Sequence, residues 1–273
     1  MPELDGQLAV VTQASSHLAR PLAEALARAG ARLALVDPRH GAVEELARDL
    51  SSLTAQASAY DGGVSSAEVS AVMKTIVAMQ GQPEILVNCP GSLAVSRSIE
   101  TNETEMRGAL EACLVQPFLW CQAVGRLMLD AGSGVIVNVS GLPGMGGWPG
   151  WLAASAALGG LHNLTHTLAS EWSRHGVRVN CLVPGVTEPM VDLLLRTPEA
   201  PDRQAVIERI PLRRLASDND LGKALIYLVR PSAGYISGEI LRVDGAWDVW
   251  GRYYAVDPHT GKAAPAPKGG AER

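Results

Sequence analysis

The chain has no long hydrophobic run and no stretch rich in basic residues. No segment approaches the roughly eighteen consecutive apolar residues of a membrane span. The start, Met-Pro-Glu-Leu-Asp-Gly, has neither the basic region nor the apolar centre of a signal peptide. The formal net charge is -5 at pH 7 and the pI is about 5.7. These absences argue against a membrane protein and against a nucleic-acid partner, and they predict a cytoplasmic location.

Cysteine is scarce and scattered. The four cysteines, none of which has a neighbour at metal-ligand spacing, are Cys89, Cys113, Cys121 and Cys181. Reduced thiols, without disulfides or zinc, are expected in a cytosolic chain of this kind. His162 and His166 lie four residues apart, as a two-histidine metal pair would, but no adjacent glutamate completes that pattern. We therefore predict no metal site and place both histidines on a helix surface or at a subunit contact.

The first forty residues carry the clearest structural pattern. An apolar run over residues 8–11 is followed by a turn of small residues and then by apolar positions at helical spacing, Leu18, Leu22 and Leu26. A second apolar run over residues 32–37 ends in Asp37. This order of strand, turn, helix and strand is typical of the first half of a dinucleotide-binding fold.

The rest of the chain extends this pattern to about Trp247. With 273 residues, 47% of them hydrophobic, the chain is long enough for one domain with a large core. We predict an α/β fold over residues 1–247, a single Rossmann-like, doubly wound parallel sheet with helices on both faces. Residues 248–273 are a C-terminal tail, aromatic at first and then predicted to be disordered. Further helices are expected over residues 41–50, 67–79, 106–130 and 152–174, and further strands over 55–61, 85–88, 135–140, 177–185 and 233–245. The helix over 106–130 carries Leu110, Leu114, Phe118 and Leu119 on its apolar side.

The first turn resembles that of the short-chain dehydrogenase/reductase family. The family pattern Thr-Gly-x-x-x-Gly-x-Gly aligns without gaps to residues 12–19, and Gln13, His17 and Ala19 stand at the three glycine places. Glycines there allow a tight turn and a close approach to the cofactor pyrophosphate. A side chain at each place works against that approach. The resemblance therefore implies weak or vestigial NAD binding and no tightly bound cofactor.

Other family-like segments reach both ends of the domain. They are Asn88-Cys89-Pro90-Gly91, the strand before Ser140, Arg178-Val179-Asn180 with Pro184-Gly185, and residues 233–245. The resemblance implies that the residues in contact with NAD are Asp37, Asp61, Asn88 and Thr187. Asp37 would bind the adenosine ribose and select NAD over NADP.

The family's catalytic residues have no counterpart in this sequence. The family uses a tyrosine as acid and base, a lysine four residues on, a serine that orients the substrate oxygen and an asparagine that holds a water molecule. Counting from the flanking family-like segments places Ala154, Leu158, Gly141 and Cys113 at these positions, in that order. No tyrosine occurs between Tyr60 and Tyr227. The resemblance therefore implies a loss of the whole catalytic set.

Two classes of function stay open. The first is a catalytically silent subunit that supports an active, homologous NAD-dependent dehydrogenase for an alcohol or hydroxyacyl substrate, in a homo- or hetero-oligomer (dimer or tetramer). This arrangement resembles that of hydroxybenzylsuccinyl-CoA dehydrogenase, where one of two related subunits is degenerate. The second is an enzyme in its own right, either an oxidoreductase with residual NAD binding or a cofactor-free lyase or isomerase. Its candidate reactive residues are Cys113, Ser140, Ser155 and His17.

Aromatic residues guide two further expectations. Trp148 and Trp151 flank the tyrosine position and are expected to fill the vacated pocket. Subunit contacts are predicted for the helices over 106–130 and 152–174 and for the last strand with its tail. The expected anchors are Trp120, Trp172, Trp247, Trp250, Tyr253 and Tyr254.

Overall fold

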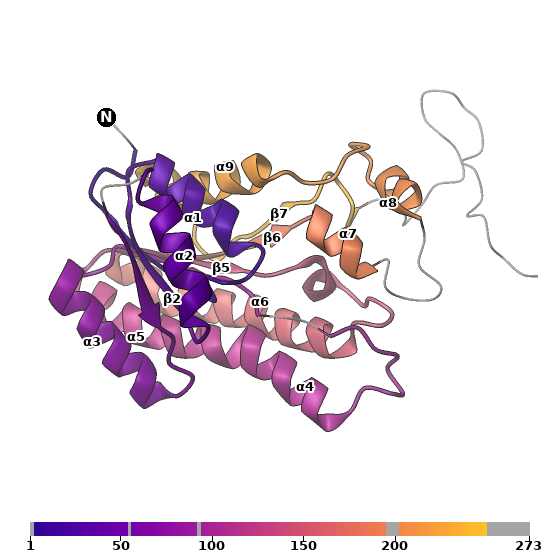
Figure 1. Ribbon diagram of the computed structural model, residues 1–273, viewed down its shortest axis with the longest axis horizontal. Helices are drawn as coiled ribbons and strands as arrows, with labels where there is room; N and C mark the ends of the chain where they lie inside the picture. The colour runs from indigo at the N-terminus through magenta and orange to yellow at the C-terminus, as the bar shows by residue number, and fades with distance from the viewer. Residues whose placement is uncertain (1–2, 54–55, 92–93, 195–201, 250–273) are drawn as a thin grey trace, which may run out of the picture.

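The computed structural model describes residues 3–53, 56–91, 94–194 and 202–249. Seven parallel strands form one sheet between two layers of helices (Figure 1), in the order β3-β2-β1-β4-β5-β6-β7. This confirms the predicted doubly wound sheet. The strands are β1 (Leu8–Thr12), β2 (Arg32–Asp37), β3 (Ala57–Asp61), β4 (Ile85–Asn88), β5 (Gly134–Val139), β6 (Val177–Pro184) and β7 (Ile240–Val243).

Alternate residues of each strand face two separate cores. Ala9 and Val11 of β1 pack with α1 (Ala19–Arg28), α2 (His40–Leu50) and α9 (Asp218–Val229). Leu8 and Val10 pack on the other face with α3 (Ser66–Gln80), α5 (Gln116–Ala131) and α6 (Leu152–Trp172). In Figure 1, α1 and α9 lie above the sheet and α3, α5 and α6 lie below it. Because both faces are covered, the central strands are almost wholly apolar.

The helix expected over residues 106–130 is longer and is interrupted. It consists of α4 (Glu103–Leu110), a π-helical turn η1 (Glu111–Val115) and α5. Asn102 and Glu105 begin it with a reciprocal capping box. The buried side of α5 carries Trp120, Cys121 and Val124, whereas Phe118 is 40% exposed. The expectation that Phe118 lies on the side facing the core is therefore wrong.

Other elements differ from expectation mainly at their ends. A short 3-10 turn, η3 (Ser173–His175), follows α6, and β7 occupies only four residues of the expected range 233–245. Three helices after β6 were not predicted: α7 (Glu188–Leu194), α8 (Arg203–Arg209) and α9. The side chains of Asp202 and Ser217 cap the last two, which is the sequence signal that was missed.

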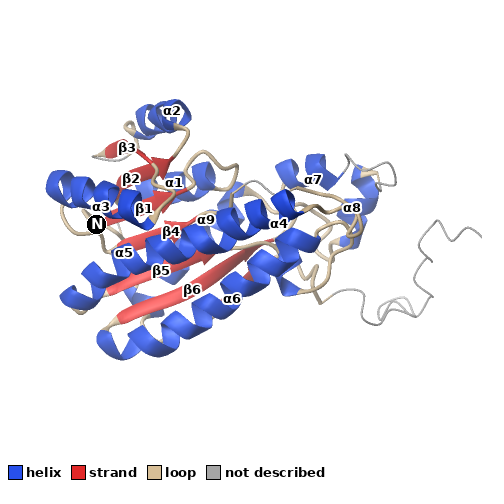
Figure 2. Cartoon of the chain, turned by 90° about the horizontal axis from the view of Figure 1, so that it is seen from below, coloured by secondary structure: helices blue, strands red, loops and turns tan. Residues whose placement is uncertain are grey.

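One helical run passes a simple test for a membrane span. Residues Glu103–Ala131 are long and apolar enough by composition, and 44% of the most apolar window is buried in the fold. Figure 2 shows α5 lying along the sheet, where it packs on β5 and α3. Such burial is characteristic of a core helix in a folded domain.

Two of the predicted interface anchors lie inside the chain. Trp120 is 3% exposed and Trp247 is 7% exposed, so neither side chain presents a surface to a partner. Trp172 packs on α5, where a Cβ added to Gly125 would lie 2.6 Å from its ring. Trp250, Tyr253 and Tyr254 lie outside the described residues. The assembly itself stays a prediction.

Candidate functional site

The carboxyl ends of β1, β4 and β5 meet where the strand order reverses, between β1 and β4. Ligands of doubly wound sheets bind at such a point. A buried chain of hydrogen bonds crosses it: Thr12 Oγ1 donates to Asn88 Oδ1 at 3.0 Å, and Asn88 Nδ2 donates to Asn138 Oδ1 at 2.9 Å. Asn138 Nδ2 donates in turn to Thr165 Oγ1 of α6 at 3.0 Å. The side chain of Asn88 thus links the carboxyl ends of β1, β4 and β5 by hydrogen bonds.

The turn between β1 and α1 keeps the shape that glycine would give it. Gln13 has a φ of 50°, in the left-handed region that favours glycine, and its carbonyl accepts a hydrogen bond from Ser16 N at 2.9 Å. Ala19 is fully buried at the start of α1. His17 lies on the surface of the turn, and desolvation lowers the pKa of its imidazole. At neutral pH His17 therefore adds bulk without a positive charge for a phosphate.

Asp37 ties this turn to the end of β2. Its carboxylate is 1% exposed. Oδ2 accepts hydrogen bonds from Ser15 N at 3.1 Å and from Ser15 Oγ at 2.5 Å, and Oδ1 accepts one from Arg39 N at 2.8 Å. The carboxylate lies where a ribose contact requires it, but its oxygens already have protein donors.

The remaining predicted cofactor residues surround the same edge of the sheet. Asp61 ends β3 directly opposite Asp37 in the strand register and is exposed. Thr187 is 6% exposed and lies just before α7, where its carbonyl accepts a hydrogen bond from Val191 N at 2.9 Å. The structure thus brings Asp37 and Asp61 together and leaves Asn88 in the interior.

The edge of the sheet suits the ribose of a dinucleotide better than it suits the pyrophosphate. Asp37 and Asp61 offer carboxylates on the ribose side, as the fold requires. On the phosphate side, Gln13 and His17 carry side chains where backbone amides alone should face the ligand. The residues present do not fit a tightly held pyrophosphate.

The four residues that the sequence resemblance assigns to the family's catalytic positions lie around an apolar contact. A Cβ added to Gly141 would lie 3.5 Å from Leu158 Cδ1, and Leu158 shares a buried apolar cluster with Cys113. Ala154, one turn earlier on α6, is 1% exposed. Burial raises the pKa of the Cys113 thiol to about 11. None of these four residues supplies an acid or a base near neutral pH, and Cys113 is not an activated nucleophile.

A polar pair lies next to this apolar contact. Ser140 follows β5, and its Oγ lies 2.7 Å from Nε2 of His162 on α6. The exposed fractions are 1% for Ser140 and 9% for His162. Burial lowers the pKa of His162, as does the neighbouring His166, while a hydrogen bond to the Gly144 backbone acts in the opposite direction.

The prediction that placed His162 on a helix surface or at a subunit contact is therefore wrong. His162 comes one helical turn after Leu158, so it shares the side of α6 that faces the site. That spacing was the available sequence signal. His166, by contrast, is exposed, and among the described residues no three His, Cys, Asp or Glu side chains are grouped to hold a metal.

Three indole rings pack on one another beside the site. Trp148 stacks on Trp247 with ring centroids 5.7 Å apart and meets Trp151 edge-on at 6.2 Å. Arg209 of α8 lies 4.5 Å above the Trp247 ring. The apolar contact at Gly141 is made by Leu158 and not by an indole. The tryptophans therefore pack on one another in the loop after β5, and Leu158 fills the space beside Gly141.

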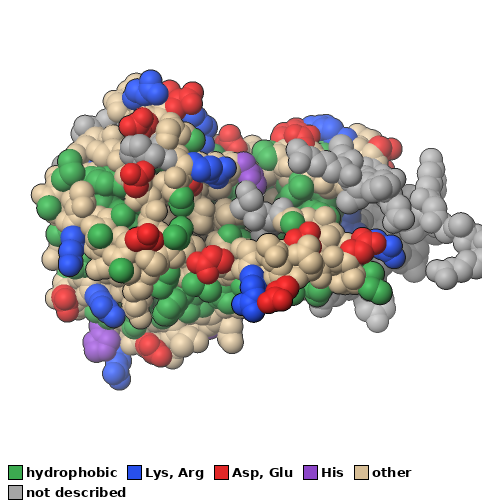
Figure 3. Space-filling model, turned by 60° about the horizontal axis from the view of Figure 1, so that its bottom comes forward, with side chains coloured by type: hydrophobic (Ala, Val, Ile, Leu, Met, Phe, Trp, Pro, Cys, Tyr) green, Lys and Arg blue, Asp and Glu red, His purple; other side chains and the backbone are tan. Residues whose placement is uncertain are grey.

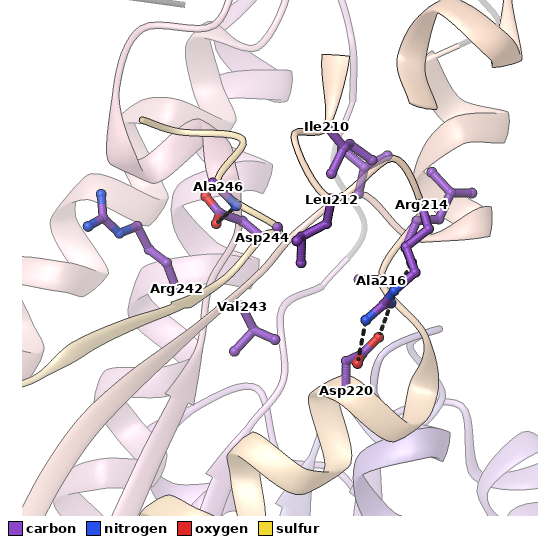
Figure 4. Close-up of a pocket in the computed structure, with 12 residues that line it drawn as sticks. Ile210, Leu212, Arg214, Ala216, Asp220, Arg242, Val243, Asp244 and Ala246 are labelled. Atoms are coloured by element: carbon purple, nitrogen blue, oxygen red, sulfur yellow. Dashed lines mark hydrogen bonds and ion pairs between the residues drawn. The ribbon is translucent and has the colours of Figure 1, made fainter. Parts of the chain in front are cut away.

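A surface pocket of about 240 Å³ opens between the end of β7 and the start of α9 (Figure 4). Two nitrogens of Arg214 bind the two carboxylate oxygens of Asp220, at 2.6 and 3.1 Å. Arg242 is paired with Asp248 at 2.8 Å. Because both cations that line this pocket are neutralised by protein carboxylates, the pocket is not a candidate anion site.

Comparison with known proteins matches the sequence and the fold to one family. Residues 13–247 match the family model described as Enoyl-(Acyl carrier protein) reductase. Galactitol 2-dehydrogenase (L-tagatose-forming) of Cereibacter sphaeroides is 32% identical over 90% of this chain and 97% of its own length. The chain belongs to the short-chain dehydrogenase/reductase family.

Solved structures of short-chain dehydrogenases share the architecture over nearly the whole domain. A putative short-chain alcohol dehydrogenase from Sinorhizobium meliloti 1021 is 30% identical, with a TM-score of 0.82 over 91% of this chain and 98% of its own. A putative NAD(P)-dependent gluconate 5-dehydrogenase from Beutenbergia cavernae, solved with NADP at low occupancy, is 30% identical, with a TM-score of 0.81 over 90% and 99% of the two chains. The chain thus belongs to an oxidoreductase family and shares that family's fold over nearly the whole domain.

Proposed function

We propose that this short-chain dehydrogenase/reductase is silent in hydride transfer and supports an active, homologous NAD-dependent dehydrogenase as its partner subunit. One observation carries the proposal. Cys113, Gly141, Ala154 and Leu158, which the family resemblance assigns to the four catalytic positions, are closely packed without an ionisable group suited to proton transfer. Reduction or oxidation at a carbonyl carbon needs a proton donor or acceptor at the oxygen, and loss of one such group typically slows the reaction by two to four decades.

The cofactor turn supports the same proposal. Gln13 and His17 place side chains on the phosphate-facing turn, and Asp37 is bonded to Ser15 and Arg39. NAD binding in this chain is proposed to be weak or vestigial. The fold is retained although the residues at the assigned catalytic and phosphate positions differ from the family pattern, which favours a role for the shape of the domain.

An exposed apolar face suits assembly with a partner. Met79 of α3, Val115 of η1, Phe118 of α5 and Leu152 of α6 are between 37% and 68% exposed. Figure 3 shows hydrophobic side chains among polar and charged ones on the side of the molecule that these helices form. Large exposed apolar side chains are a common feature of protein contact surfaces. The partner is proposed to be a homologous subunit that oxidises an alcohol, the class of reaction named for the galactitol relative.

A second candidate is an NAD(P)-dependent dehydrogenase in its own right. The identity of 32% to galactitol 2-dehydrogenase, and of 32% to the D-threitol dehydrogenase of Mycolicibacterium smegmatis, favours it. The carboxylate of Asp37 at the ribose side favours it as well. It would require an acid and base outside the four positions named above.

Turnover separates the two candidates. The native protein is purified from its source cells, proteins that copurify are identified, and NAD⁺ reduction is measured for the chain alone, for the partner alone and for both together with galactitol and D-threitol. We expect no turnover by the chain alone and a higher rate for the pair than for the partner. A rate for the isolated chain on the order of 1 to 1,000 per second would refute the proposal.

A further inference from the structure

The hydrogen-bonded pair of Ser140 and His162 is held on rigid elements from both sides. Ser140 N donates to Leu182 O of β6 at 2.9 Å, which fixes the backbone at the end of β5. On α6, the turn after His162 is fixed by the bond between Asn138 Nδ2 and Thr165 Oγ1. The separation of 2.7 Å between Ser140 Oγ and His162 Nε2 is therefore set by the central sheet and its longest helix.

A third group orients the imidazole. A Cβ added to Gly144 would lie 2.9 Å from His162 Cε1 and 2.8 Å from Leu158 Cβ, so only glycine allows the loop to come this close. The Gly144 backbone forms a hydrogen bond with the ring. When the Gly144 carbonyl holds the ring proton, Nε2 accepts the hydroxyl proton of Ser140. This is the order of nucleophile, base and orienting group that activates a serine.

A second unexplained hydroxyl lies on the same helix. Ser155 is two turns before His162 on α6, so the two residues occupy the same side of the helix. The Oγ atom of Ser155 is buried and has no hydrogen-bond partner among the described residues. A buried hydroxyl without a partner is destabilising unless a ligand or water satisfies it.

We infer that Ser140 is a nucleophile activated by His162, and that it accepts an acyl group from an apolar ester or thioester. As Ser140 Oγ bonds to the carbonyl carbon, its proton passes to His162 Nε2. The bond from that carbon to the leaving oxygen or sulfur then breaks, and the leaving group takes the proton. Water repeats the sequence at the acyl-serine, which releases the carboxylic acid and restores Ser140. Leu158 and Pro143, which border Gly141, favour an apolar acyl chain.

Access to Ser140 is assigned to residues 146–150 of the following loop, so that Gly144 stays in contact with His162. A Cβ added to Gly146 or Gly147 would meet no atom within 4 Å, and Trp148 of this segment stacks on Trp247. Displacement of residues 146–150 is inferred to uncover Ser140 without moving the sheet or Gly144. This chemistry needs neither NAD nor a partner chain, so it stands or fails independently of the silent-subunit proposal.

An alkyl fluorophosphonate tests the inference directly. Attack by Ser140 Oγ forms an O–P bond, breaks the P–F bond and releases fluoride and the serine proton, which leaves a stable adduct. We expect one adduct in the full-length protein, mapped by peptide mass spectrometry to Ser140. The rate should fall at least tenfold in His162→Gln and the adduct should be absent in Ser140→Ala. Trp148→Ala, which frees the loop, should react several-fold faster than the wild type.

The matched control is Ser170→Ala, which removes an exposed serine from the same helix and should leave the rate unchanged. Modification of other serines without Ser140 would overturn the inference. So would the absence of an adduct in both the wild type and Trp148→Ala, because then the pair is only a structural hydrogen bond. The wild-type result does not depend on whether any variant folds.

Discussion

Two neighbouring residues that follow β5 make contacts of opposite character with α6. Gly141 faces Leu158, and the preceding Ser140 faces His162, one helical turn further on. The first contact excludes charge because Leu158 is fully buried in an apolar cluster. The second contact is a buried polar pair directly beside the first. A change of one side chain on α6 therefore changes whether this region is apolar or polar.

Restoring the family's lysine should destabilise this chain. Leu158→Lys places an ammonium in a fully buried apolar site that has lost its partner tyrosine, and an uncompensated buried charge costs about 3–5 kcal/mol. Chemical denaturation monitored by circular dichroism measures the free energy of unfolding. Leu158→Met, which keeps the volume, should cost less than about 1.5 kcal/mol. Equal stability of the lysine variant and the wild type would show that the position opens to water.

His162 should make the stability of the fold depend on pH. Burial lowers its pKa below the ordinary value of 6.5, so below pH 6.5 the unfolded chain binds the proton more readily than the folded chain. Stability is then fully present above 6.5 and falls as the pH is lowered toward the folded-state pKa, by up to about 1.4 kcal/mol per unit. Urea denaturation between pH 5 and 8 measures this. Subtracting the pH dependence of His162→Gln from that of the wild type removes the contributions of His17 and of the carboxylates to the free energy of unfolding. Identical slopes for the two proteins would contradict the expectation.

At the scale of elements, the loop over residues 141–150 has to approach α6 closely at one glycine and not at the next. Gly144→Ala should lower the free energy of unfolding by about 1–3 kcal/mol, because its Cβ would overlap Leu158 and His162. Gly146→Ala is the control, since its backbone is extended and its Cβ would meet nothing within 4 Å. It should change stability by less than about 0.5 kcal/mol. Thermal unfolding of both variants measures the difference, and equal losses would show that the loop does not touch α6.

The turn between β1 and α1 should bind NAD poorly because of its side chains. Calorimetry is expected to give a Kd above about 1 mM. The variant with Gln13→Gly, His17→Gly and Ala19→Gly should bind at least about tenfold more tightly, equivalent to ~1.4 kcal/mol. Gln13→Gly also relieves the positive φ of 50°, so the variant remains folded. Micromolar binding by the unaltered chain would show that His17 contacts the phosphates instead of blocking them.

For the whole molecule, the face formed by α3, α5 and α6 is expected to carry the subunit contact. Phe118→Asp introduces a charge at an exposed apolar position of α5 and should weaken assembly at least tenfold in sedimentation velocity experiments without changing the thermal midpoint. Leu212→Asp, at another exposed apolar position, is the control. Assembly that tolerates Phe118→Asp would exclude this face.

The tail makes a separate prediction. Truncation should begin after Val249, because Trp247 is part of the buried aromatic group and its removal would damage the fold. Loss of residues 250–273 is expected to weaken assembly and to lower the partner's turnover. A truncated chain that assembles normally and leaves the partner's turnover unchanged would refute a role for the tail.

Sequence patterns were sufficient for the sheet and insufficient for the contacts. The buried strands read as apolar runs, so β1, β2 and β4 could be placed almost to the residue. Asp37 could be placed at the end of β2, but its bonds to Ser15 and Arg39 depend on how the turn folds back. Ser140 and His162 are twenty-two residues apart, so no local pattern joins them. Trp120 and Trp247 were misassigned because an indole in a sequence gives no sign of whether it packs inward or outward.

The π turn η1 shifts the phase of the long helix that contains it. In a π turn each backbone N–H bonds to the carbonyl five residues earlier, whereas in an α-helix it bonds to the carbonyl four residues earlier. The turn therefore accommodates one extra residue, and every later side chain is displaced by about 100° around the helix axis. The buried positions are Ala109 before η1 and Cys113 within it, and after it they include Pro117, Trp120 and Cys121. With the extra residue in place, Trp120 and Cys121 of α5 face the core while Phe118 faces outward. Deletion of one residue within Glu111–Val115 should therefore rotate the buried side of α5 by about 100° relative to α4.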